Sequence, residues 1–214
     1  GWAAQIEGKE SNVALFEVSS RYGTLTYGLR PEGYDGWAFR EAGGGGDVTL
    51  PFSFNNDGEL IIGLLLESRA NMGDQPVWCA IGGFIEAGET HEMAQAREAV
   101  EEAGIDARKA QILPGLPTNA NRAFFVADPL KNEGVHAFGL ELPFDQFESD
   151  GQCWKLKTTA VLPGFKKTSD VRFFRWNEAI TGTADSLARA AIAQLVAHLF
   201  AGVLRLPRKT SVGK

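Results

Sequence analysis

The sequence predicts a mixed α/β (α+β) sandwich, in which strands alternate with two helices. Of its 214 residues, 44% are hydrophobic and 22% are charged, a composition typical of a globular domain that buries a core. Short runs of β-forming residues recur along the chain, and glycine, proline, asparagine and aspartate separate them. Two longer segments, 89–103 and 185–203, have the composition or the apolar spacing of helices.

The N-terminal part of the chain is predicted to form a β extension. Segments 12–18 and 24–30 are rich in β-forming residues and flank a short polar stretch, which indicates a hairpin. The four glycines Gly43 to Gly46 have no side chains to pack and predict a linker or a mobile loop. The predicted domains are therefore an N-terminal β extension over 1–45, a main domain over 46–204 and a basic tail over 205–214.

The main domain is predicted to begin with a second hairpin. Segments 48–54 and 59–67 flank the step from Asp57 to Gly58, which is a strong hairpin signal. Loops that contain proline and glycine then separate further strand-like segments, which are 122–127, 135–142 and 171–176. In 185–203, apolar residues recur on one stripe, so a helix is expected to close the domain.

Segment 89–103 is the most strongly predicted helix. It contains neither glycine nor proline and is rich in alanine, glutamate and glutamine. Thr90 near its start and Gly104 just past its end are residues that favour helix caps.

Charge and composition exclude several classes of function. The chain has 21 basic and 27 acidic residues and a net charge of −6, the wrong sign for binding nucleic acid through its phosphates. No apolar run approaches the roughly 20 residues of a membrane-spanning helix. Cys79 and Cys153 form no CxxC pattern and predict neither a disulfide framework nor a zinc site. Residues 1–10 carry charges where a secretory signal would be apolar, so a cytoplasmic location is expected.

The predicted helix 89–103 carries a cluster of carboxylates. Glu98, Glu101 and Glu102 are spaced i, i+3 and i+4, which places their Cβ atoms within about 5–6 Å on one face. Their mutual repulsion is relieved if they bind a divalent cation, and hard oxygen ligands suit Mg²⁺ or Mn²⁺. Arg97 is placed to offset part of this charge, or to hold the preceding loop through a bidentate pair with Glu89.

Residues 83–105 match the Nudix box, G-x5-E-x7-R-E-U-x-E-E-x-G-U, in which U is a bulky aliphatic residue. The seven fixed positions are filled at the right spacing by Gly83, Glu89, Arg97, Glu98, Glu101, Glu102 and Gly104. Ile105 fills the last U position, and the first is occupied by Ala99, which is smaller than usual. The chain therefore resembles the Nudix hydrolases.

This resemblance implies a Nudix α/β/α sandwich with a mixed β-sheet. It also implies Mg²⁺- or Mn²⁺-dependent hydrolysis of a nucleoside diphosphate linked to another group, X. Glu98 and Glu102 would be the principal metal ligands, Glu101 a further ligand or a base, and Gly82 a ligand through its carbonyl. The residues with a structural role would be Gly83, Glu89, Arg97 and Gly104.

A looser resemblance over roughly 12–204 connects the chain to the ADP-ribose and nucleotide-sugar pyrophosphatase branch. The N-terminal extension, a glycine-containing loop followed by a strand within 115–129, and the C-terminal helix support it. Hydrolysis of nucleoside triphosphates or dinucleoside polyphosphates is an alternative, and so is nucleotide sensing without cleavage. A homodimer is expected because open strand edges in the extension invite a partner.

Residues outside the box are candidates for reading the substrate. Arg69 could hold a phosphate or a ribose. Trp78 could stack on a base, as could Tyr34, Trp37 and Phe39, although core packing is the commoner role of such side chains. In this family a loop carboxylate often supplies a base outside the box, and the candidates are Glu133, Glu141 and Glu148.

Overall fold

The structure is a computed structural model, and it describes residues 13–21, 23–29, 35–41, 43–69, 73–113, 123–128, 133–165 and 170–200. The predicted basic tail over 205–214 and the aromatic residue Tyr34 lie outside the described residues. So do the side chains of Trp37, Phe39, Arg69 and Glu133, whose backbone is described.

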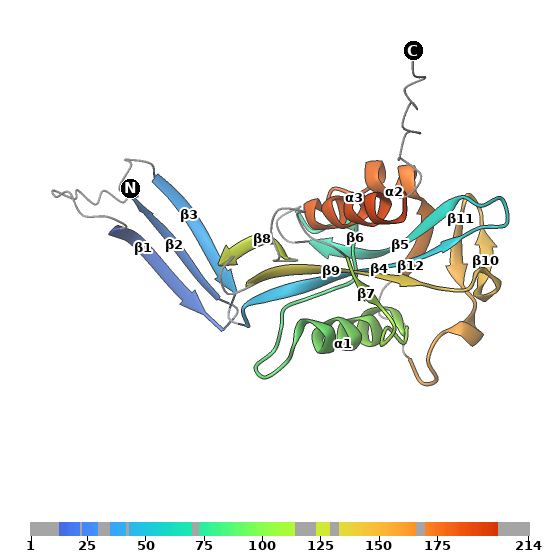
Figure 1. Ribbon diagram of the computed structural model, residues 1–214, viewed down its shortest axis with the longest axis horizontal. Helices are drawn as coiled ribbons and strands as arrows, with labels where there is room; N and C mark the ends of the chain where they lie inside the picture. Colours follow the sequence, from blue (N-terminus) through green and yellow to red (C-terminus); the bar gives the residue numbers. More distant parts are fainter. Residues whose placement is uncertain are drawn as a thin grey trace, which may run out of the picture.

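A mixed sheet forms the centre of the molecule (Figure 1). In the described residues it has nine strands, ordered β10-β11-β12-β5-β4-β9-β7, with β6 paired to β5 and β8 paired to β9. Strands β4 and β9 run parallel, and β4 and β5 form the antiparallel hairpin that the sequence predicts. The strands are β4 (Gly45–Phe54), β5 (Leu60–Arg69), β6 (Gln75–Cys79), β7 (Gln111–Ile112), β8 (Ala123–Asp128), β9 (Glu133–Glu141), β10 (Phe147–Asp150), β11 (Cys153–Leu156) and β12 (Asp170–Arg175).

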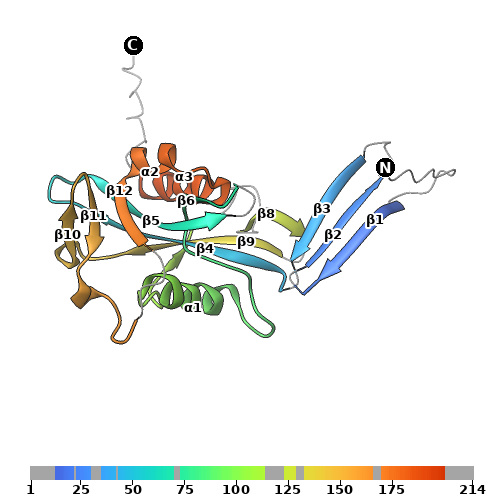
Figure 2. The same ribbon diagram turned by 180° about the vertical axis from the view of Figure 1, so that it is seen from behind.

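Helices cover both faces of this sheet (Figures 1 and 2). Helix α1 (His91–Ala103) lies on one face, and α2 (Trp176–Gly182) and α3 (Ser186–Phe200) lie on the other. One hydrophobic core lies between the sheet and α3, and another lies between the sheet and α1. Strand β5 contributes to both because side chains alternate along a strand, so that Ile62 belongs to the first core and Ile61 to the second. The predicted α/β/α sandwich is confirmed. No helix among the described residues is both long enough and apolar enough to cross a membrane.

Helix α1 is capped at both ends as the sequence predicts, although it begins two residues later than expected. The Thr90 side chain accepts a hydrogen bond from the Met93 amide at 3.3 Å. Gly104 adopts the left-handed conformation with φ of 66°, and its amide donates to the Val100 carbonyl at 3.0 Å. A Cβ at Gly104 would collide with Val161 and Phe165, so this position favours glycine for both conformation and space.

A separate three-stranded antiparallel sheet lies beyond one end of the central sheet (Figures 1 and 2). Its first two strands, β1 (Val13–Ser20) and β2 (Gly23–Leu29), form the hairpin that the sequence predicts. Strand β3 (Asp35–Glu41), which was not predicted, pairs with β2 along its length.

The prediction that Gly43 to Gly46 form a linker or a mobile loop is wrong for the second half of the run. Gly45 and Gly46 are buried residues of β4. A Cβ on Gly45 would collide with the carbonyl of Gly134 in β9, and one on Gly46 would lie 2.7 Å from the Gly83 carbonyl oxygen. Glycine therefore permits close backbone approach here, which brings the start of β4 against the loop that precedes α1.

Candidate active site

Helix α1 directs Glu98 and Glu102 toward the loop at Gly82 and Gly83. The Glu98 carboxylate lies so close to Gly83 that a Cβ at this glycine would collide with it. Glu102 Oε2 accepts a hydrogen bond from the Gly82 amide at 3.1 Å. The Glu101 side chain is 59% exposed, whereas that of Glu98 is 14% exposed. Glu98 and Glu102 therefore lie against the loop, and Glu101 lies nearer to solvent.

Arg97 ties the loop to the helix through its whole guanidinium group. Its Nε and Nη2 atoms donate to the two carboxylate oxygens of Glu89 at 2.9 and 3.0 Å, which is the predicted bidentate pair. Nη2 also donates to the Phe84 carbonyl at 3.1 Å, and Nη1 donates to Glu98 Oε1 at 2.7 Å and to Glu101 Oε2 at 3.4 Å. One side chain thus holds the loop and orients two of the box glutamates.

The two glutamates nearest Arg97 have opposite pKa shifts. Hydrogen bonds from Arg97 lower the pKa of Glu89 below its ordinary value. Burial raises the pKa of Glu98, although its hydrogen bond to Arg97 opposes the shift. Glu98 is therefore a desolvated carboxylate with only part of its charge compensated.

Asp47 is a further acidic residue at this site, and the sequence analysis did not select it. It lies near the start of β4 and is 2% exposed, and neither of its carboxylate oxygens has a hydrogen-bond partner among the described residues. Burial, together with the nearby charge of Glu98, raises the pKa of Asp47 to about 8. Its backbone amide donates to the Gly83 carbonyl at 3.0 Å.

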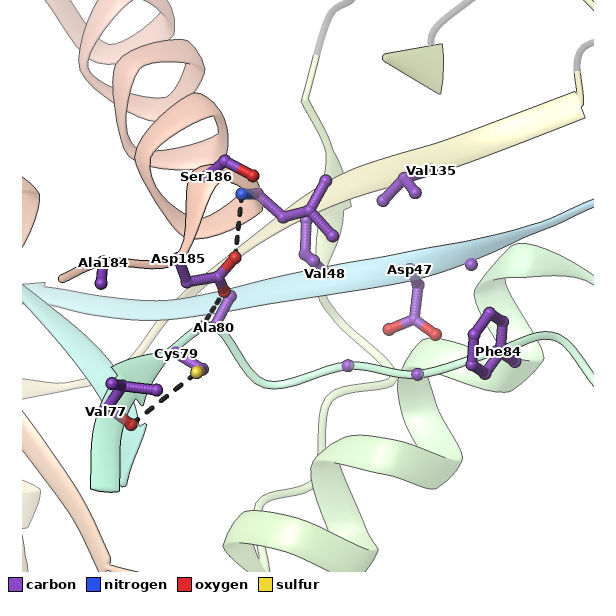
Figure 3. Close-up of a pocket in the computed structure, with 14 residues that line it drawn as sticks. Asp47, Val48, Val77, Cys79, Ala80, Phe84, Val135, Ala184, Asp185 and Ser186 are labelled. Atoms are coloured by element: carbon purple, nitrogen blue, oxygen red, sulfur yellow. Dashed lines mark hydrogen bonds between the residues drawn. The ribbon is translucent and has the colours of Figure 1, made fainter. Parts of the chain in front are cut away.

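A cavity of about 380 Å³ opens beside Asp47, between the end of β6, the loop before α1 and the start of α3 (Figure 3). The Phe84 ring, which is 45% exposed, borders it. A second cavity of about 440 Å³ is lined by Glu102, Glu148 and Lys155, among others. Gly82, which lines the first cavity, donates to Glu102, which lines the second.

The start of α3 holds the segment that leads into the loop. Thr183 Oγ1 donates to the Trp78 carbonyl, and Asp185 Oδ2 accepts from the Ala80 amide at 3.3 Å. The other carboxylate oxygen of Asp185 accepts from the Leu187 amide at 2.9 Å, so this side chain joins the helix terminus to the chain just before Gly82.

The candidates outside the box occupy different places. The Trp78 ring packs edge-on against Phe174 at 4.9 Å between ring centroids, on the α3 side of the sheet, and is not among the residues that line the first cavity. Glu148 shares the second cavity with Glu102 and pairs with Lys155 at 3.4 Å.

Glu133 and Glu141 lie at opposite ends of β9. Glu141 pairs with Phe52, which lies five positions after Asp47 in β4, or about 16 Å along the strand. The structure therefore does not bring Glu141 to the box carboxylates. Glu133 precedes Gly134, which pairs with Gly45, so its backbone lies at the same end of the sheet as Asp47.

The oxygen-rich donor set fits a hard divalent cation. Carboxylate and carbonyl oxygens suit Mg²⁺ or Mn²⁺, and the buried oxygens of Asp47 have no other partner. In the part of the chain that the structure describes, no three His, Cys, Asp or Glu side chains already form a metal-binding group. Arg97 holds Glu98, and the Gly82 amide holds Glu102. Glu98 and Glu102, with Asp47 nearby, are the carboxylates that would hold such a cation.

Residues 47–195 match the family model of the NUDIX domain. The chain belongs to the Nudix family. It is a Nudix hydrolase of the pyrophosphatase type, and enzymes of this family generally use divalent metal ions. The box that the sequence predicts thus lies within the matched region.

Solved structures resemble this Nudix hydrolase at low sequence identity. A crystal structure of an ADP compounds hydrolase is 12% identical in sequence, with a TM-score of 0.50. The alignment covers 94% of this chain and 100% of the other. A binary complex of a C. elegans Ap4A hydrolase is 18% identical in sequence, with a TM-score of 0.45. The alignment covers 73% of this chain and 98% of the other. The first likeness supports the Nudix fold. No curated protein matches the chain.

Proposed function

We propose that this Nudix hydrolase is a divalent-metal-dependent pyrophosphohydrolase that cleaves a nucleoside diphosphate linked to X, with ADP-ribose or a nucleotide sugar as substrate. The observation that carries the proposal is the placement of Glu98 and Glu102 against Gly82 and Gly83, two glycines that line a cavity of about 380 Å³. A diphosphate bound at this loop could place one of its substituents in that cavity.

In this proposal the chain's residues hold the cation and position the water. Bound Mg²⁺ or Mn²⁺ would lower the pKa of a water molecule and neutralise charge on the diphosphate oxygens. Glu98, Glu102 and the Gly82 carbonyl would hold the cation, and Glu101 would serve as a further ligand or accept the proton. Water attacks one phosphorus, the bond from that phosphorus to the bridging oxygen breaks, and two phosphate monoesters leave.

Two other residues are suited to further roles in the reaction. Glu148 is favoured as the base outside the box, because it shares a cavity with Glu102. Phe84 is suited to stack on a nucleobase, since its ring is 45% exposed beside the first cavity.

The choice of ADP-ribose or a nucleotide sugar rests on the overall architecture. The alignment with the ADP compounds hydrolase covers 94% of this chain, which is more than residues 47–195 alone make up. An N-terminal extension is therefore compatible with that fold. Hydrolysis of nucleoside triphosphates or dinucleoside polyphosphates, and nucleotide sensing without cleavage, are the competing outcomes.

Release of AMP, or of phosphate after a coupled phosphatase, would test the substrate class. The substrates are ADP-ribose, nucleotide sugars, NADH, dinucleoside polyphosphates and nucleoside triphosphates, each with Mg²⁺, with Mn²⁺ and with chelator. We expect metal-dependent cleavage of ADP-ribose or a nucleotide sugar at the highest rate, and none with chelator.

Preferred cleavage of a triphosphate or a dinucleoside polyphosphate would instead assign the alternative hydrolase class. Tight nucleotide binding without any product under either metal would support the sensing module.

We further propose that residues 1–45 form a dimerisation extension of a catalytic domain over 46–204. Val18 and Leu25 face each other across β1 and β2, and Tyr27 follows on the same face of β2. Their exposed fractions are 50%, 37% and 36%, so this face presents an apolar patch that a second copy could cover.

Light scattering at micromolar concentration is expected to give twice the 23.1 kDa mass of one chain. Leu25→Glu should shift the mass toward that of the monomer, because it places a charge in the patch. A monomeric mass for the unmodified protein would exclude the dimer.

A further inference from the structure

We propose that Asp47 is a ligand of the divalent cation, so that β4 and α1 both supply carboxylates to the metal at the loop of Gly82 and Gly83. The inference rests on the proposed function. It adds a carboxylate from outside the Nudix box to the ligand set.

The register of β4 places the Asp47 side chain on the face of the sheet that carries α1. Side chains alternate along a strand, so Asp47 and Thr49 share one face while Val48 lies on the other. Thr49 Oγ1 donates to Gln95 Oε1 on α1 at 3.5 Å, and Val48 belongs to the core that packs against α3. Figure 3 shows the Asp47 carboxylate directed from β4 toward the segment that carries Phe84.

The loop brings Asp47 close to the box glutamates. The Asp47 amide donates to the Gly83 carbonyl at 3.0 Å, and the Glu98 carboxylate also lies against Gly83. A Cβ at Gly82 would collide with the Asp47 carbonyl oxygen, so this backbone is equally close. Glu98 and Glu102 both act electrostatically on Asp47.

Among the described residues, no group donates a hydrogen bond to the Asp47 carboxylate. Asp47 is 2% exposed, and both of its oxygens are buried without a hydrogen-bond donor. Arg97 is the cation that acts on it, but the guanidinium donates to Glu89, Glu98, Glu101 and the Phe84 carbonyl. His136, which pairs with Asp47 across β4 and β9, stacks on His91 at 3.5 Å between ring centroids.

A buried carboxylate without a partner is costly, and proteins satisfy such groups with hydrogen bonds, counter-ions or metal ions. A divalent cation between Asp47, Glu98 and Glu102 would satisfy all three at once. The rival explanation is a structural carboxylic acid that stays protonated in the core and never binds metal.

Metal affinity separates these explanations without any measurement of activity. Isothermal titration calorimetry and the EPR signal of free Mn²⁺ would give the Kd for Mn²⁺ of the full chain. We expect Asp47→Asn to raise this Kd at least about tenfold, a loss typical for a group that holds or orients a bound metal. Asp145→Asn, which removes the same charge from an exposed position, is the matched control and should leave the Kd unchanged.

Glu102→Gln distinguishes the failure of this inference from the failure of the proposed function. If Glu102→Gln weakens Mn²⁺ binding and Asp47→Asn does not, the box site is real and Asp47 is only a structural acid. If neither variant changes the Kd, the metal site of the proposed function fails as well.

A second substitution keeps the inference testable if Asp47→Asn does not fold. Asp47→Cys replaces hard oxygen ligands with a soft sulfur, which favours Cd²⁺ over Mg²⁺ and Mn²⁺. We expect it to bind Cd²⁺ more tightly and Mn²⁺ more weakly than the unmodified protein does. Cys79, which lines the same cavity, and Cys153 are free thiols that could themselves bind Cd²⁺. The unmodified protein measures their contribution, and Asp145→Cys measures that of an added cysteine elsewhere. Unchanged affinities for both metals would contradict a ligand role for Asp47.

Discussion

Glu98→Gln and Glu102→Gln are each expected to reduce kcat about 10²- to 10³-fold with saturating Mg²⁺, while the fold is retained. Such a loss corresponds to about 3–4 kcal/mol of transition-state stabilisation, the usual effect of removing one preorganised charge-stabilising group. A neutral amide occupies the same space as the carboxylate but is a much weaker ligand for a hard cation. The two side chains lie one helical turn apart, and each contacts the loop at Gly82 and Gly83.

Initial rates on the preferred substrate would measure this effect, and circular dichroism would confirm that the fold is intact. Glu101→Gln is the matched comparison on the same helix. Its loss should be smaller, because the Glu101 side chain is 59% exposed and lies nearer to solvent. Wild-type rates in both Glu98→Gln and Glu102→Gln would refute the assignment of these residues as metal ligands.

Arg97→Ala is expected to lower the free energy of unfolding by about 2–3 kcal/mol and to reduce turnover as well. The Arg97 side chain is only 22% exposed, and its removal leaves the partly buried carboxylates of Glu89 and Glu98 without their counter-charge. The loop would also lose its hydrogen bond at the Phe84 carbonyl. Turnover should fall because this loop carries the glycines against which Glu98 and Glu102, the proposed metal ligands, lie.

Urea denaturation would measure the loss as a lower midpoint with an unchanged slope. Arg97→Lys is the informative partner variant. Its ammonium keeps the charge but cannot form the bidentate pair with Glu89 while it also reaches Glu98 and the loop. We expect the midpoint of Arg97→Lys to lie between those of the wild type and Arg97→Ala. A wild-type midpoint in Arg97→Ala would refute the structural role of Arg97.

Local sequence signals predicted the helix and the box because the physics behind them is local. Thr90 and Gly104 cap α1 through hydrogen bonds within a few residues, and the pair between Arg97 and Glu89 in the preceding loop spans eight residues. The hairpins were predicted for the same reason, since turn residues act on their immediate neighbours.

The burial of Asp47 was missed because alternation of polar and apolar residues along a strand is misleading in a sheet that is covered on both faces. Asp47, Thr49 and Ser53 alternate with apolar residues, a pattern that usually marks a face exposed to water. Here the same three residues are 2%, 1% and 2% exposed, because α1 and its neighbouring segments cover that face. Their burial depends on tertiary packing, which no short window of the sequence contains.

The glycine run was misread for a related reason. A stretch of glycines predicts backbone freedom, yet Gly45 and Gly46 lie where the backbones of Gly134 and Gly83 leave no room for a side chain. The short strands β6, β10 and β11 and the helix α2 were also not predicted. Each is seven residues or fewer, too short to establish a period.

The hydrogen bonds from the start of α3 to Trp78 and Ala80 span 105 residues of sequence. Such contacts form only after a large loss of chain entropy, so they belong to the slow, non-local part of folding. During synthesis the box helix leaves the ribosome long before α3 does, and the loop at Gly82 lacks this support in the meantime. The candidate active site is therefore completed near the end of folding, although its signature motif is contiguous in the sequence.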